Sequence, residues 1–190
     1  EGTKKYSSLE FDEVLDSLGS NLGFGSGLDS SVVSVSSLKA NLSDTLDLAK
    51  EALVNPTFPQ NEIDRIKKQT LASIVQEENR PASIAYRNIG KLLYGEDHPY
   101  GKPLTGSGVS ATISSITRED IISVHARAVN PSNLTFAVAG DIDLDSLVDM
   151  LENKFGDWNS DSNDTLKSLS KVALPDSRNI YLIDKPNAQQ

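Results

Sequence analysis

A single proline divides the most regular helical pattern of the sequence into two predicted helices. Before it, apolar residues recur at helical spacing and form one stripe: Ile63, Ile66, Leu71, Ile74 and Val75. Arg80 precedes Pro81, and helical backbone geometry is disfavoured for the residue before a proline. A second helical pattern then runs through Ile84, Ile89, Leu92 and Leu93. The sequence therefore predicts two consecutive helices that meet at residues 79–81.

Capping and turn residues mark the elements upstream of this pair. Ser7 followed by Glu10 is a capping-box pattern and predicts a helix over about residues 8–18. Valines alternating with serines predict two strands joined around residues 27–29. Ser43 is expected to cap a further helix, which ends before Pro56.

Similar signals mark the elements downstream. Thr117 with Asp120 predicts a capped helix through His125. Residues 134–139 are apolar enough for a central strand, and residues 179–184 are interpreted as a final short strand. Between these two strands, residues 144–155 carry the last amphipathic helical pattern. Because strands and helices do not alternate regularly, the predicted class is α+β, with helices packed on a largely antiparallel sheet.

Composition limits the function. The chain has 190 residues, of which 37% are hydrophobic, so it is long enough for a domain with a core. It contains no cysteine, which excludes thiolate metal sites and cysteine nucleophiles. A net charge of −9 argues against a nucleic-acid partner, since binding phosphates requires a basic face. No run approaches the roughly 20 apolar residues of a membrane span.

The order of motifs resembles a known family. The two helices are followed by His-Pro-Tyr-Gly-x-Pro-x-x-Gly at residues 98–106, then by the Thr117 helix and a segment ending in Ala-Gly-Asp at residues 139–141. Together with Gly2-Thr3 near the start, this resembles one repeat of the M16 (insulinase, pitrilysin, mitochondrial processing peptidase) zinc metallopeptidases. The resemblance covers nearly the whole chain and implies an M16-type α+β repeat that is N-terminally incomplete, as a fragment of a longer protein.

The resemblance also implies a domain organisation. Residues 1–158 are expected to form the incomplete M16-like domain. Residues 159–178 include a stretch rich in serine, aspartate and asparagine and are expected to be a linker. Residues 179–190 would then hold the first strand leading into the next repeat.

The family's zinc site is expected to be absent from this segment. M16 proteases bind zinc through a His-x-x-Glu-His helix, which would lie upstream of Gly2, and through a distal glutamate. Ser73 occupies the position of that glutamate, and a neutral hydroxyl is a poor zinc ligand. Glu77 and Glu78 are interpreted as a solvated acidic helix end. We therefore expect no catalytic residue and no metal ligand here, with zinc held by a catalytic partner half.

Other catalytic arrangements are not favoured. His98 and His125 each lack a second histidine three or four residues away, so neither forms a paired zinc-binding motif. They are interpreted as a satisfied loop histidine and a partly buried helical one. The serines include no Gly-x-Ser-x-Gly elbow.

One short run is a candidate for binding substrate. Gly23, Phe24, Gly25 and Ser26 align with the strand of catalytic members whose exposed edge takes an extended peptide as an added strand. Glycines keep the backbone accessible for such pairing but orient a scissile bond poorly. The alternative is that they only permit a bulge or close packing. An unpaired edge also invites self-association.

Three functions remain open at this point. The first is a non-catalytic M16 domain that helps form the substrate chamber of a zinc protease with a catalytic partner half. The second is a fragment of a catalytic M16 metalloendopeptidase whose His-x-x-Glu-His helix lies upstream. The third is a non-proteolytic scaffold or core subunit. On its own the segment is expected to be inactive, and a bacterial periplasmic or cell-envelope location is expected.

Overall fold

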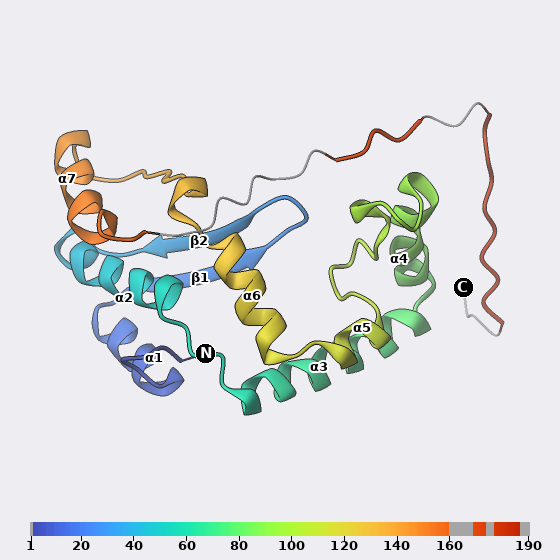
Figure 1. The fold of residues 1–190 in the computed structure, drawn as a ribbon, viewed down its shortest axis with the longest axis horizontal. Coiled ribbons are helices and arrows are strands. Elements are labelled where there is room, and N and C mark those ends of the chain that lie inside the picture. Colours follow the sequence, from blue (N-terminus) through green and yellow to red (C-terminus); the bar gives the residue numbers. More distant parts are fainter. Residues whose placement is uncertain (1, 160–168, 174–176, 187–190) are drawn as a thin grey trace. The chain divides into compact units, whose positions relative to one another are not determined.

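The computed structural model describes residues 2–159, 169–173 and 177–186, which separate into two compact units (Figure 1). The first unit comprises residues 1–63 and 117–164, and the second comprises residues 64–116 and 165–190. The first unit contains α1 (Ser8–Ser17), β1 (Asn21–Ser26), β2 (Ser31–Ser36), α2 (Leu42–Val54), α6 (Arg118–Ala128) and α7 (Leu144–Phe155). Helix α3 (Gln60–Asn79) begins there and continues into the second unit, which also holds α4 (Pro81–Tyr94) and α5 (Ser110–Ser115). Single 3₁₀ turns lie at Lys39–Asn41, Pro99–Gly101 and Pro131–Asn133.

Both capping boxes are confirmed. The Ser7 hydroxyl accepts from the Glu10 amide at 3.3 Å, while the Glu10 carboxylate accepts from the Ser7 amide at 2.8 Å. Thr117 and Asp120 make the same reciprocal pair at the start of α6. Each box satisfies two amides that the first helical turn leaves without partners.

The expected cap of α2 was wrong. The helix begins at Leu42, directly after a 3₁₀ turn, so Ser43 already lies inside it. Asn41 occupies the capping position, but its side-chain amide instead donates to the Leu18 carbonyl at 2.8 Å. A long-range hydrogen bond to the end of α1 thus replaces the local cap, and a local sequence pattern could not reveal it.

Helix α2 supplies most of the buried apolar core of the first unit. Leu46, Leu48 and Ala49 are almost fully buried, and Thr45 is completely buried beside them. The Thr45 hydroxyl is satisfied by the Asn41 carbonyl and the Ser20 hydroxyl, each at 2.8 Å. Polar and apolar burial therefore coincide on one face of the helix.

A second contact in this unit holds the N-terminal segment. Glu51 of α2 is buried, and its carboxylate accepts hydrogen bonds from the Lys5 amide and from the Asn55 side chain. An isolated bridge joins Thr3 to Pro56. Residues 2–6 are thus fixed to the chain between α2 and α3.

The predicted hairpin is confirmed, with β1 antiparallel to β2. Phe24 lies opposite Val33 and Leu22 opposite Val35, so these four side chains share one face of the pair. Gly23 and Gly25 lie opposite Ser34 and Val32 on the other face.

Two further predicted strands do not form within the described residues. Residues 134–139 and 179–184 belong to no strand there, although both runs are apolar. A strand exists only where its backbone finds a hydrogen-bonded neighbour, and sequence pattern alone does not guarantee that neighbour. Helices with an antiparallel hairpin still agree with the predicted α+β class. The proposed boundaries at 158 and 178 remain a prediction, and much of the expected linker lies outside the described residues.

The break between α3 and α4 is where the sequence predicted it. Arg80 has extended backbone angles, with φ −108° and ψ 120°, and Pro81 opens α4 in its first turn. The loop after α4 packs tightly onto it. Gly90 is buried under the carbonyls of residues 100 and 102, and the rings of Tyr94, His98 and Tyr100 contact one another.

Aromatic rings also gather at the end of α7. Phe155 lies between Phe136 and Trp158, with ring centroids 5.4 and 6.3 Å away. Among the residues described, no helix is both long enough and apolar enough to span a membrane.

Candidate functional site

The first candidate site is the β1 strand with its four predicted substrate-binding residues. Gly23, Phe24, Gly25 and Ser26 all lie in β1 and pair with β2 on one side. In the described part of the chain the sheet has only these two strands, so the other edge of β1 carries no ladder partner. Phe24 is 58% exposed.

The two glycines of β1 differ in their surroundings. A Cβ atom at Gly25 would meet no heavy atom within 4 Å, so the face of the strand is uncrowded there. A Cβ at Gly23 would lie 2.6 Å from the Ser34 hydroxyl oxygen. Gly23 therefore permits close packing within the hairpin, whereas the role of Gly25 in binding peptide stays a prediction.

The second candidate position is Ser73 on α3. Its side chain is exposed, and its hydroxyl donates to the Gln69 carbonyl one turn earlier at 3.1 Å. The adjacent Ile74 is completely buried, which fixes the orientation of the helix. No three histidine, aspartate or glutamate side chains of the described residues are grouped so that they could hold a metal ion. A neutral hydroxyl is a poor zinc ligand, so the side chain at Ser73 does not fit the family's distal ligand.

The interpretation of Glu77 as a solvated residue was wrong. Its carboxylate accepts from the Arg87 guanidinium at 2.6 Å and from the Ser107 hydroxyl at 2.7 Å, and only 22% of the side chain is exposed. Burial alone raises the pKa of Glu77, but hydrogen bonds from Ser107, Arg87 and Thr105 and the Arg87 charge outweigh it and lower the pKa. Glu78 is the more exposed of the two glutamates.

Arg87 is a residue that sequence reasoning missed. It donates to the Glu77 carboxylate, to the Ser107 hydroxyl and to the Gly108 carbonyl, the last at 2.9 Å. These bonds connect the end of α3, the middle of α4 and the loop at residues 105–108. The partners are separated in sequence by a helix break, so no periodicity indicates them.

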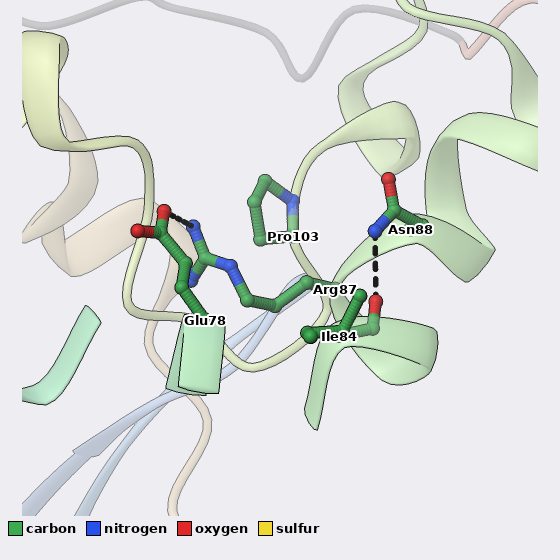
Figure 2. A pocket seen from close by; sticks show the side chains of 5 residues that line it. All are labelled: Glu78, Ile84, Arg87, Asn88 and Pro103. Carbon is green, nitrogen blue, oxygen red and sulfur yellow. Dashed lines mark hydrogen bonds and ion pairs between the residues drawn. The ribbon is translucent and has the colours of Figure 1, made fainter. Parts of the chain in front are cut away.

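A pocket of about 360 Å³ lies beside this network (Figure 2). It is lined by Glu78, Ile84, Arg87, Asn88 and Pro103. The Asn88 amide already donates to the Ile84 carbonyl at 2.8 Å, and the Arg87 guanidinium is held by the network. Arg87 thus joins α4 to α3, whereas the Asn88 bond lies within α4.

Both histidines are held by structural contacts, as expected. His98 is buried; its Nδ1 accepts from the Tyr100 amide at 3.0 Å, and its Nε2 lies 3.2 Å from the Ser170 carbonyl oxygen. The His125 ring packs against Phe58 at 5.3 Å. Burial lowers the pKa of His125, and a hydrogen bond with the Leu53 backbone opposes that shift in part.

The fold and these motifs agree with the outcome of comparison with known proteins. Residues 1–107 match the family described as Insulinase (Peptidase family M16), and residues 115–190 match the family described as Peptidase M16 inactive domain. The chain belongs to the M16 peptidase family.

Individual relatives agree with this assignment. An uncharacterized zinc protease of Rickettsia felis is 27% identical over 154 residues, which are 81% of this chain and 37% of that protein. The chain thus spans well under half the length of this curated relative. A solved structure from Pseudomonas fluorescens, described as a peptidase M16 inactive domain, matches with a TM-score of 0.82 and 26% identity, covering 91% of this chain and 41% of that one.

A further solved structure shows the same fold. It is the first half of the periplasmic protease PqqL from Escherichia coli, with a TM-score of 0.74 and 18% identity. The match covers 92% of this chain and 38% of that structure. At this identity the likeness concerns the fold alone.

Proposed function

We propose that this chain is a non-catalytic M16 domain that helps to form a peptide-binding chamber with a zinc-bearing catalytic half. The observation that carries the proposal is Ser73. At the position where the resemblance places the distal zinc-binding glutamate, α3 presents a neutral hydroxyl that is hydrogen bonded back to its own helix. Such a group cannot replace a carboxylate as a zinc ligand.

The chemistry of β1 supports a role in holding peptide. Among the described residues one edge of β1 has no ladder partner, and it offers backbone groups for an added strand. Between residues 20 and 38 the chain carries a single charge, on Asp29, so peptide pairing there would not require removing charged groups from water. Self-association through the same edge is the competing use of this surface.

A periplasmic or envelope location is part of the proposal. Its support is that one structural relative, PqqL, is described as a periplasmic protease. Fractionation of the source cells tests this part independently.

The zinc assignment is tested by Ser73→Arg in the full-length protein that contains this sequence, with Gln76→Arg as the matched control. Both positions are exposed on α3, so both variants should fold. We expect neither to change the zinc content or the chelator-sensitive cleavage of an unstructured peptide. In a catalytic segment whose zinc helix lies upstream, a bulky cation at residue 73 would lower both, while Gln76→Arg would not. That result would overturn the proposal, as would an absence of zinc and cleavage even in the complete assembly, which would favour a scaffold.

The peptide-binding role is tested by hydrogen exchange across Asn21–Ser26. We expect weak protection in a monomeric sample and stronger protection when an extended peptide with alternating apolar side chains is added. A peptide of the same length with proline at alternate positions is the matched control, because proline cannot complete a strand ladder. Strong protection that peptide does not change would contradict the proposal. Protection that rises with protein concentration would instead show self-association.

A further inference from the structure

Phe58, in the short connection between α2 and α3, has an unusual backbone conformation. Its φ of 47° is positive, and no other non-glycine residue in the described part of the chain shares this feature. The left-handed region is unfavourable for a bulky side chain. The following residue is Pro59, and a residue before proline favours extended geometry. Both the side chain and the next residue therefore oppose the conformation that Phe58 adopts.

Arg118 holds this conformation from outside the connection. Its Nε donates to the Phe58 carbonyl and its Nη2 to the Thr57 carbonyl, each at 2.9 Å. Arg118 is the first residue of α6, where the helix dipole is positive and favours anions. The helix dipole does not stabilise a cation at that end. The hydrogen bonds to the carbonyls of Thr57 and Phe58 are therefore the interactions that stabilise the Arg118 side chain where it lies.

The Phe58 side chain is fixed as well. Its ring packs edge-on against the ring of His125, which lies seven residues after Arg118 on α6. The ring centroids are 5.3 Å apart, and the ring planes are inclined by 69°. One helix thus holds both the backbone and the ring of a single residue.

The chain on either side of Phe58 is anchored separately. Upstream, the Thr57 amide donates to the Gly2 carbonyl at 3.2 Å, and the Lys4 amide donates to the Asn55 carbonyl at 3.0 Å. Downstream, the amides of Glu62 and Ile63 both donate to the Pro59 carbonyl at 3.1 Å in the first turn of α3. A change of backbone conformation in this connection that keeps the flanking bonds would therefore have to occur at Phe58.

We infer that Phe58 is a two-state joint at the start of α3, held by Arg118 in its left-handed state and poised to relax to an extended state when that hold is lost. Relaxation would redirect the chain entering α3 without unfolding α2 or α6. The joint is independent of the proposed peptide-binding role and stands or fails without it. Strained residues of this kind persist only where surrounding contacts over-determine them, and they recur at segments that switch.

The test is hydrogen exchange on Arg118→Gln in the full-length protein, with Arg127→Gln on the same helix as the matched control. We expect exchange of the amides of residues 57, 62 and 63 to rise about tenfold in Arg118→Gln. Amides of α7 should keep their wild-type rates. Arg127→Gln should leave all of these rates unchanged.

A second variant separates the joint from simple loss of a contact. Phe58→Gly and Phe58→Ala, each added to Arg118→Gln, both remove the ring that packs on His125, but only glycine adopts positive φ without cost. Exchange should therefore be slower in the glycine double variant than in the alanine one. Three results would overturn the inference: unchanged exchange in Arg118→Gln, an equal rise throughout α7, or a glycine double variant that exchanges as fast as the alanine one.

Discussion

The Arg87 guanidinium lies 2.6 Å from the Glu77 carboxylate and joins α3 to α4 across the Arg80–Pro81 break. Only 10% of the Arg87 side chain is exposed. The pair is therefore shielded from water, and it is satisfied further by Ser107 and Gly108. Removing one member leaves the other buried without its charge partner.

Arg87→Gln should lower the free energy of unfolding by about 2 kcal/mol, because Glu77 loses its counter-ion in a partly buried place. Urea denaturation measures the change. Lys91→Gln, on the same helix, is the control, since its ion pair with Glu96 is exposed and should contribute nothing measurable. Equal effects of the two substitutions would show that burial of the Arg87 pair has no energetic importance.

Glu77 should give the protein an acid-sensitive contribution to stability. Its pKa in the folded state lies below the ordinary value of 4.5, because bonds from Ser107, Arg87 and Thr105 outweigh the effect of burial. A carboxylate with a lowered pKa stabilises the fold above 4.5, and this contribution is lost as the pH falls through the folded-state pKa. Unfolding free energies measured from pH 6 downward should fall less steeply in Glu77→Gln than in the wild type. Parallel curves would contradict the assignment.

His125 should produce a second pH dependence at higher pH. Burial holds its pKa below the ordinary value of 6.5, so the neutral ring is the form that the fold favours. The stabilisation is present above 6.5 and is lost as the pH falls through the lowered folded-state pKa, because the unfolded chain then binds a proton more readily. Titration of the ring by NMR gives the pKa directly. His125→Phe should flatten this part of the stability profile, and an unshifted titration would refute the explanation.

Gly90→Ala should destabilise the protein even though alanine is ordinarily the better helix former by about 1 kcal/mol. A Cβ there would lie 2.7 Å from the Lys102 carbonyl oxygen and would also contact the Tyr100 carbonyl, so the loop would have to move. A loss of about 1–3 kcal/mol is expected from such overpacking. The reverse substitution Ala85→Gly, at an exposed site of the same helix, should cost about 1 kcal/mol by propensity alone. A gain in stability from Gly90→Ala would show that the loop yields freely.

Local patterns predicted the parts of this fold that depend on neighbouring residues. Ser7 and Thr117 cap their helices, Pro81 opens α4, and the valine–serine alternation forms β2. Features decided by distant partners were missed. The Asn41 side chain donates to the Leu18 carbonyl and does not cap α2. Residues 134–139 form no β-ladder within the described part of the chain.

The candidate positions differ in how far local patterns could predict them. The sequence places Ser73 correctly on a continuous helix, while its correspondence to the zinc-binding glutamate stays a prediction. The burial of Glu77 could not be predicted, since it depends on Arg87 and Ser107, which reach it only after the chain has turned at Arg80. The left-handed Phe58 was equally hidden, because its stabilising arginine is 60 residues away in sequence.

The ring cluster at the end of α7 has a practical consequence for unfolding measurements on the 190-residue chain. The chain contains one tryptophan, and Trp158 lies next to Phe155 in the first compact unit. Its fluorescence therefore reports on its surroundings in that unit, whereas Tyr94 and Tyr100 belong to the second. Coincident tryptophan and circular-dichroism transitions would establish cooperative unfolding, and separated transitions would assign each stability change to its own unit.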